Sequence, residues 1–385
     1  MTTYYNQAQP VNIRNKYDEY SVIEFLCKMP SGRQLKAGSF RLNGYLKVLK
    51  TNSAGVVSAI DGSEGVMFNQ FAGVHSLIRN VTETINGRTI SSMQQYGRYA
   101  SMQCAHDATP EGLITNSGHA SELKGALNTR LLVGNDITKG IAFSMKPHIA
   151  INKSSSDLPQ TTYSDIKLML QLGSGIEALY ITGGKPVSPT IFNLTFELTD
   201  LQLSWMETVE DKSLINAPIT FNTIAQMTQT ITGVNSTISV VSPTAFDAVS
   251  MSFLRQSSLN NLYLDSQLSE YVPDITSVAF TINGDTGPLT YTILPPCYQD
   301  IALNYYKSLD NSGSAIWRIA DPTKNSIKNR FLSENGNFGI GCAYKTSIND
   351  KLAVQLQIDD NTLYNPSVAG NAIDCYIYVN GFITL

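Results

Sequence analysis

Short runs of alternating or β-branched residues, closed by Gly, Asn, Asp or Pro, recur along the whole chain. Such runs predict β-strands, because the side chains of a strand point alternately to its two faces. Few segments keep helical spacing, so the pattern predicts an all-β protein with a few short helices in its loops. We expect strands at 22–26, 40–49, 78–85, 141–151, 166–172 and 191–205, and again at 219–224, 238–241, 248–254, 277–282, 339–345, 352–358 and 372–384.

Two of these strands end in the same dipeptide. The strand at 78–85 runs into Asn86-Gly87, and the strand at 277–282 runs into Asn283-Gly284. Asn-Gly is the strongest short signal for a two-residue hairpin, because both central residues of a type I′ turn need positive φ. We therefore predict Asn86, Gly87, Asn283 and Gly284 as structural turns.

Later landmarks repeat in the same order. The strand at 166–172 is answered by that at 352–358, and the strand at 191–205 by that at 372–384. Each pair is separated by about half of the 385 residues. The sequence thus predicts one β unit that occurs twice.

A short helix is expected after each Asn-Gly turn. Ser92 and Gln95 have the spacing of a capping box ahead of a helix that carries Tyr96. Pro295 opens the second helix, which keeps helical spacing to about residue 309. The two helices extend the repeat beyond the strands.

Charged residues after Trp205, together with Pro218, interrupt the apolar pattern near the middle of the chain. A composition shift of this kind predicts a domain boundary. We expect an N-terminal arm at 1–20, a first β domain at 21–208, a linker at 209–218 and a second β domain at 219–385.

Composition narrows the class of partner. Charged residues are only 15% of the chain and the formal net charge is −4, so phosphates and anionic membranes are not attracted in general. We expect no direct sequence-specific binding of nucleic acid. The N-terminus shows no signal sequence, and no run of eighteen apolar residues occurs, which predicts a chain that is made and kept in solution.

The cysteines and histidines show no spacing typical of a metal or redox site. No Cys-x-x-Cys or His-x-His occurs, and the second half has no histidine, which excludes a metal-dependent bicupin. We expect buried reduced thiols, no metal and no cofactor. The residues are Cys27, Cys104, Cys297, Cys342 and Cys375, and His75, His106, His119 and His148.

Motifs for catalysis are also lacking. No Gly-x-Ser-x-Gly elbow occurs, and Gly183-Gly184-Lys185 lacks the rest of a phosphate-binding loop. Adjacent carboxylates at Glu210-Asp211 and Asp359-Asp360 leave an amidase or glycosidase open as an alternative. A lectin-like glycan-binding sandwich is a further alternative, because the 19 tyrosines suit sugar binding as well as protein interfaces. We expect no catalytic residue and no enzyme activity.

The segment 77–99 (LIRNVTETINGRTISSMQQYGRY) resembles a segment of double jelly-roll major capsid proteins of the adenovirus, virophage and tailless membrane-containing phage lineage. In that family a strand ends in Ile-Asn-Gly and a helix bearing Tyr follows. The segments 143–159, 166–172 and 191–205 then come in the order that the family shows. The resemblance implies two tandem eight-stranded jelly-roll β-sandwiches.

The resemblance also implies a function. Such proteins form homotrimers, and their six jelly rolls make a pseudo-hexameric capsomer of an icosahedral shell around a DNA genome. The implied partners are other copies of the chain, neighbouring capsomers and minor capsid or penton proteins. An internal membrane is a further partner, which the arm at 1–20 would meet. The implied location is the virion, after assembly in the host cytoplasm.

Overall fold

The computed structural model describes residues 2–60, 66–69, 72–106, 140–181, 191–240, 245–267, 275–292, 339–343, 350–358 and 365–385. The chain divides into two compact units. Unit 1 comprises Met1–Thr223, Asn260–Gln267 and Ile383–Leu385, and unit 2 comprises Ile224–Leu259 and Leu268–Phe382. Strands dominate both units and the helices are short, which confirms the predicted all-β class.

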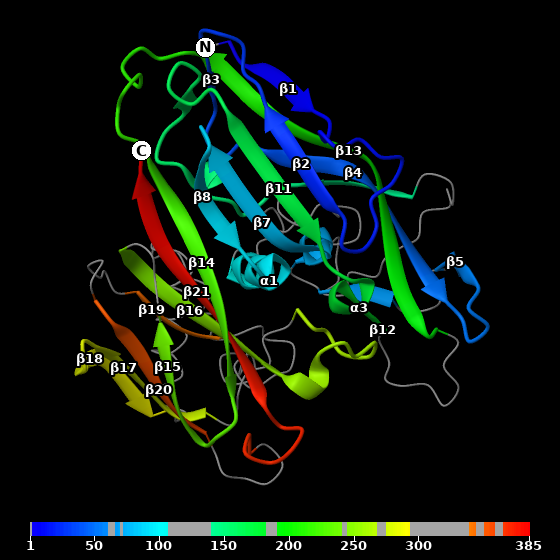
Figure 1. Ribbon diagram of the computed structural model, residues 1–385, viewed down its shortest axis with the longest axis vertical. Helices are drawn as coiled ribbons and strands as arrows, with labels where there is room; N and C mark the ends of the chain where they lie inside the picture. Colours follow the sequence, from blue (N-terminus) through cyan, green and yellow to red (C-terminus); the bar gives the residue numbers. More distant parts are fainter. Residues whose placement is uncertain are drawn as a thin grey trace, which may run out of the picture. The chain divides into compact units, whose positions relative to one another are not determined.

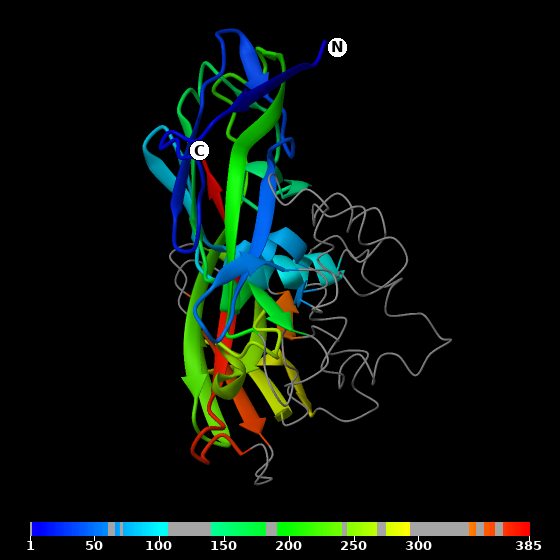
Figure 2. The ribbon, with the colours of Figure 1, turned by 90° about the vertical axis from the view of Figure 1, so that its right-hand side faces the viewer.

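One sheet of unit 1 contains four antiparallel strands in the order β1-β13-β4-β9. Their bounds are Tyr4–Ala8 for β1, Asn193–Val209 for β13, Arg41–Thr51 for β4 and Ile141–Met145 for β9. Buried and half-buried positions alternate along most of β4, as expected for a strand with one face on a core. The long strands β13 and β4 lie side by side in both ribbon views (Figures 1 and 2).

The second sheet of unit 1 has the order β2-β11-β7-β8, again antiparallel. Its strands are Val22–Cys27 (β2), Ile166–Leu172 (β11), Ile78–Ile85 (β7) and Arg88–Met93 (β8). Every second residue of β11, from Ile166 to Leu172, is buried. The period-2 pattern in the sequence therefore marks the side that faces the core.

Unit 2 also has two four-stranded sheets, in the orders β14-β21-β16-β19 and β15-β20-β17-β18. The first contains Thr220–Ile231 (β14), Ile373–Thr384 (β21), Phe246–Arg255 (β16) and Ile340–Ala343 (β19). The second contains Asn235–Val240 (β15), Leu352–Ile358 (β20), Ile275–Ile282 (β17) and Asp285–Thr292 (β18).

The strand order is the same in the two units. Numbered along the chain within its unit, each set of eight strands forms one sheet of the first, eighth, third and sixth strands and another of the second, seventh, fourth and fifth. This is the order of an eight-stranded jelly roll, which contains two Greek keys. The predicted fold of two tandem jelly rolls is confirmed.

Short elements lie in the connections between these strands. They are β3 (Arg33–Leu35), β5 (Val57–Ala59), β6 (Val66–Phe68), η1 (Gly73–Leu77), α1 (Tyr96–His106), η2 (Ile151–Lys153), β10 (Leu158–Pro159), α3 (Gly175–Ala178), β12 (Leu179–Ile181) and η3 (Gln256–Ser258). No helix in the described part of the chain is long and apolar enough to span a membrane.

The N-terminal residues differ from the expected arm. Residues 4–8 form β1 and pair with β13, and Tyr17 is buried and exchanges two backbone hydrogen bonds with Leu198. Tyr-Tyr-Asn-Gln shows no apolar alternation, yet an edge strand is held by its backbone groups and does not need one. The segment that looked like a tail thus supplies the first strand of a jelly roll.

The predicted capping box at Ser92 is wrong. Helix α1 begins at Tyr96, whereas Ser92 lies in β8, where its hydroxyl contacts that of Thr82 at 3.3 Å. Gln95, directly before the helix, has φ 51°. The strand extends through the Ser-Ser pair, so the spacing to Gln95 carries no cap.

Several expectations fall outside the described residues. These are the helix at 295–309 and the second halves of the strands expected at 339–345 and of the loop at 173–189. The chain leaves β13 at Val209 and enters β14 at Thr220. We keep 209–218 as the proposed linker between 21–208 and 219–385.

Candidate functional site

The hairpin between β7 and β8 turns at Asn86 and Gly87. Ile85 pairs with Arg88, so these two residues make the whole turn. Their φ angles are 50° and 76°, both in the left-handed region. Gly adopts this region freely and Asn is among the few other residues that tolerate it, which explains why this dipeptide stands here.

Asn86 also connects the hairpin to β11. Its backbone N–H donates to the carbonyl oxygen of Asp165 at 2.7 Å, and its side-chain Oδ1 accepts the backbone N–H of Asp165 at 3.1 Å. Its Nδ2 donates to the carbonyl oxygen of Thr162 at 2.7 Å. Asp165 directly precedes β11, so the turn fixes the point at which β11 begins.

The hairpin between β17 and β18 has the same construction in unit 2. Ile282 pairs with Asp285, and the turn residues Asn283 and Gly284 have φ angles of 54° and 90°. The backbone N–H of Asn283 donates to the carbonyl oxygen of Lys351 at 2.9 Å, and Oδ1 of Asn283 accepts the Lys351 N–H at 2.9 Å. Lys351 directly precedes β20, the strand that corresponds to β11 in this unit. We propose that both dipeptides fix strand register.

A cluster of four buried polar side chains lies in unit 1, and we call it the histidine cluster: His75, Tyr96, Cys104 and His148. Nδ1 of His75 is hydrogen-bonded to the Tyr96 phenol oxygen at 2.8 Å, and the backbone N–H of His148 donates to the same oxygen at 3.0 Å. Sγ of Cys104 lies 3.3 Å from Nε2 of His148. Three elements therefore meet in one polar site: η1, α1 and the connection from β9 to η2.

Close approach of α1 and η1 depends on Gly97. A Cβ built at Gly97 would lie 3.0 Å from Cα of Ser76 and 3.2 Å from the Ser76 carbonyl oxygen. Contacts this short are tighter than ordinary packing allows, so only Gly fits here. The missing side chain lets Tyr96 and Cys104 on α1 reach His75 on η1.

Burial changes the protonation of the cluster. It lowers the pKa of His75 to about 3 and holds the pKa of His148 well below its usual value, with the His75 ring as a further cause at His148. Burial also raises the pKa of Tyr96 well above its usual value. At neutral pH the two imidazoles and the phenol are uncharged, because a charge away from water is costly.

Glu83 on β7 is a buried carboxyl group close to this cluster. Its Oε1 accepts the backbone N–H of Ala150 and its Oε2 that of Ile151, both at 2.8 Å. Burial raises its pKa to about 7, although the two N–H donors and Lys153 act in the opposite direction. Glu83 thereby fixes the connection that carries His148 and begins η2.

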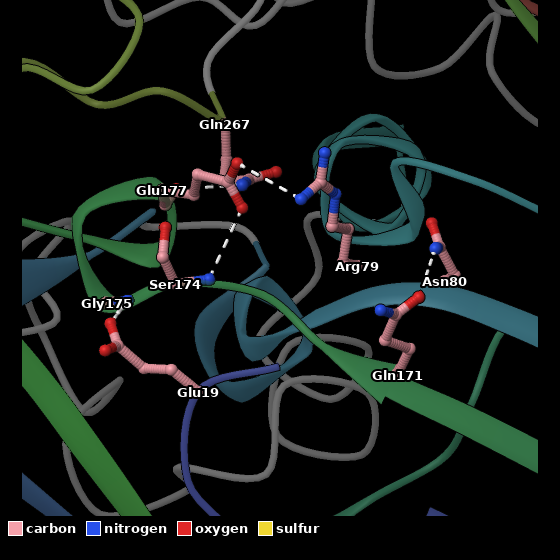
Figure 3. Close-up of polar contacts among 8 residues, drawn as sticks. All are labelled: Glu19, Arg79, Asn80, Gln171, Ser174, Gly175, Glu177 and Gln267. Atoms are coloured by element: carbon pink, nitrogen blue, oxygen red, sulfur yellow. Dashed lines mark hydrogen bonds and ion pairs between the residues drawn. The ribbon is translucent and has the colours of Figure 1, made fainter. Parts of the chain in front are cut away.

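A second polar network surrounds α3 (Figure 3). Glu177 accepts the N–H of Ser174 at 3.4 Å and forms an ion pair with Arg79 at 3.9 Å, while Glu19 accepts the N–H of Gly175. Nε2 of Gln267 donates to the Glu177 carbonyl oxygen at 2.8 Å. Gln267 ends the segment 260–267, which follows β16 in the chain but belongs to unit 1.

The segment 260–267 is bound to unit 1 at further points. The N–H of Ile181 donates to the carbonyl oxygen of Leu262 at 2.6 Å, and Nδ2 of Asn69 donates to Oδ2 of Asp265 at 2.7 Å. A guanidinium nitrogen of the buried Arg98 donates to the carbonyl oxygen of Ser266. Residues from the second half of the sequence thus complete the first unit.

The other residues singled out in the sequence do not form a joint site among the described residues. Glu210 accepts two hydrogen bonds from Thr161, and Asp211 accepts two from Ser213, so each carboxylate serves a local turn. The thiols Cys27, Cys104, Cys342 and Cys375 are buried and free. Outside the described residues lie His119, Cys297, Asp359, Asp360 and 183–185, and nothing is described of the His106 side chain.

No family model matches the chain, and no curated protein matches its sequence. Solved structures match over its full length. The Faustovirus major capsid protein aligns with a TM-score of 0.65 at 8% identity, over 100% of this chain and 90% of that chain. The PBCV-1 virus capsid aligns with a TM-score of 0.57 at 10% identity, over 100% and 94%, and the mavirus major capsid protein with 0.53 at 11%, over 99% and 90%. At such identities the likeness shows the fold.

Proposed function

Since the chain has the double jelly-roll fold of viral major capsid proteins, we propose that it is itself a major capsid protein. The observation that carries the proposal is the duplication: the same eight-strand order occurs twice in one chain, and the likeness to capsid proteins extends over both copies. A single jelly roll is shared by many functions, whereas the tandem pair is matched here over the whole chain by shell-forming proteins.

The duplication supports a trimeric capsomer on physical grounds. Three chains with two similar wedges each present six wedges, which tile a hexagonal lattice, while only three chains have to associate. We propose a homotrimer that forms pseudo-hexameric capsomers of an icosahedral shell around a DNA genome. We further propose that the chain acts structurally and not as an enzyme.

Residues 1–20 are the proposed contact with further partners. Between β1 and β2, Val11 and Ile13 are 58% and 71% exposed, and Tyr5 in β1 is 80% exposed. Apolar side chains this exposed and this close in sequence favour a partner that covers them. We propose neighbouring capsomers, minor capsid or penton proteins, or an internal membrane as that partner, in a virion assembled in the host cytoplasm.

The oligomer tests the proposal most directly. We expect native mass spectrometry of the purified chain to give a species of three times 42.1 kDa that persists on dilution, and electron microscopy to show capsomers of hexagonal outline. A monomer at every concentration, with hydrolase or glycan-binding activity, would show that the proposal is wrong.

A pair of matched variants separates the trimer from its higher contacts. Val11→Asp with Ile13→Asp places two charges on the exposed segment, and Val56→Asp with Val57→Asp places two charges on the equally exposed turn before β5. We expect both proteins to remain trimeric. Only the first pair is expected to lose shell assembly or flotation with lipid vesicles.

A further inference from the structure

We propose that His75, Cys104 and His148 bind a zinc ion inside unit 1. One ligand atom from each residue lies within 4.8 Å of the other two, and all three residues are buried. This inference does not rest on the proposed capsid function, because it follows from side chains of unit 1 alone. The spacing along the sequence predicted no metal, since the three residues come from three separate elements.

The donor set suits zinc. Two imidazole nitrogens and one thiolate sulfur are borderline-soft ligands, which Zn²⁺ binds in tetrahedral sites. An imidazole binds a metal only in its neutral form, and burial keeps both rings neutral at neutral pH. Cys104 binds as the thiolate, so its S–H proton leaves to solvent as the ion enters.

The geometry is close to that of a formed site. With Zn–S of about 2.3 Å and Zn–N of about 2.0–2.1 Å at a tetrahedral angle, sulfur and nitrogen ligands lie about 3.5 Å apart. The distance from Cys104 Sγ to His148 Nε2 is 3.3 Å. Separations of up to 4.8 Å to the third ligand atom close through a small rotation of the His75 ring. Water takes the fourth position.

The surroundings hold the ligands in place. A metal-binding histidine commonly bonds through its other nitrogen to a second group, which fixes the orientation of the ring. Tyr96 does this for His75 through Nδ1, and the same phenol oxygen accepts the N–H of His148. Tyr96 is therefore a positioning residue that aligns two ligands at once.

The charges near the site are mixed. Lys146 and Lys153 act on His148, and the carboxyl group of Glu83 acts on Tyr96. One thiolate leaves a zinc site with two imidazoles at a single positive charge, which Glu83 partly offsets. The lysines oppose the ion, so the affinity comes from the three direct bonds and not from the local field.

The ion would link η1, α1 and the connection after β9. These elements carry His75, Cys104 and His148 from distant points of the sequence, and a common ligand that ties distant points stabilises a fold. Because the ligands are buried, the ion enters while unit 1 folds. The site is structural.

Metal content and cobalt spectroscopy of the full chain test this inference. Protein produced in zinc-supplemented medium without chelators is expected to contain one zinc per chain. After unfolding and refolding with Co²⁺ in place of zinc, it is expected to show the thiolate-to-cobalt charge-transfer band and the visible bands of tetrahedral cobalt. Tyr96→Phe is expected to weaken cobalt binding about tenfold or more.

A second buried cysteine of unit 1 supplies the control. Cys104→Ser is expected to abolish the charge-transfer band and the bound zinc, whereas Cys27→Ser is expected to retain both. Wild-type protein without zinc and without a cobalt–thiolate band would show that the cluster is only hydrogen-bonded, and the inference would be wrong. The wild-type spectrum decides this even if Cys104→Ser does not fold. Equal zinc in both folded variants would also overturn it.

Discussion

Asn283 and Lys351 exchange two hydrogen bonds of 2.9 Å, one through the Asn backbone N–H and one through its side-chain Oδ1. Asn86 and Asp165 make the same exchange in unit 1. In each case the partner is the residue before the seventh strand of the jelly roll. The duplication therefore extends from strand order to individual atoms, and it gives the two turns a common purpose.

Replacement of the turn asparagines tests that purpose. Asn86→Gly and Asn283→Gly keep the left-handed turn accessible but remove the side-chain hydrogen bonds, and each is expected to lower the free energy of unfolding by about 1–2 kcal/mol. Hydrogen exchange should accelerate locally, in β7 and β8 for the first variant and in β17 and β18 for the second. A loss in only one of the two variants would contradict an equivalent role.

Gly87 tests the backbone alone. A Cβ at Gly87 would meet nothing within 4 Å, so the cost of Gly87→Val comes from its φ of 76°. A β-branched residue held there is expected to cost about 2 kcal/mol and to reduce the yield of folded protein. Urea unfolding measures the cost. Gly233→Val is the control, because the nearest atom to a Cβ there is 3.8 Å away and no positive φ is required; similar losses in both would contradict the turn assignment.

Glu83 predicts a pH dependence. Its pKa in the folded protein, about 7, is above the ordinary value of 4.5, so the folded state binds more protons than the unfolded state between these values. The contribution of Glu83 to stability is thus fully present below about pH 4.5 and is lost as the pH rises through about 7. Unfolding by urea at several pH values measures this slope.

Glu83→Gln is expected to remove that part of the slope. It should also lower stability at all pH values by about 1–3 kcal/mol, because the amide has only one oxygen for the N–H groups of Ala150 and Ile151. Glu24→Gln is the control, since Glu24 only pairs with Lys167 at the surface. An unchanged slope in Glu83→Gln would assign the pH dependence to other groups.

Gly97→Ala sets helix propensity against packing. Alanine favours a helix over glycine by about 1 kcal/mol, yet its Cβ would lie 3.0 Å from Ser76 Cα and from Oε1 of Gln267. We expect the melting temperature to fall, measured by circular dichroism. Gly233→Ala should leave it nearly unchanged, and a rise in Gly97→Ala would show that α1 and η1 tolerate separation.

The strand pattern was predictable because it is local. Ile166–Leu172 alternates in sequence just as it alternates in burial, and Asn-Gly marks a turn through the φ angles that these two residues accept. β1 was missed because Tyr4–Ala8 is an edge strand without apolar alternation. Its pairing with β13 depends on backbone groups, which every sequence has.

The histidine cluster was not predictable from the sequence. His75, Cys104 and His148 share no short spacing, and they meet only because η1, α1 and the connection after β9 converge. Gly97 contributes through the absence of a side chain, which no pattern of polar residues shows. Chemistry assembled by tertiary contacts leaves little trace in a single sequence.

The segment 260–267 has a consequence for the order of synthesis. The ribosome releases the strands of the first jelly roll, through β13 at Val209, before residues 260–267 exist. N-terminal domains generally fold first during translation, but here Asn69, Ile181 and Glu177 wait for partners that are made some fifty or more residues later. The part of the protein that is translated first is therefore completed only once translation of the second jelly roll is under way, and a nascent chain stalled between the two would hold an open first unit.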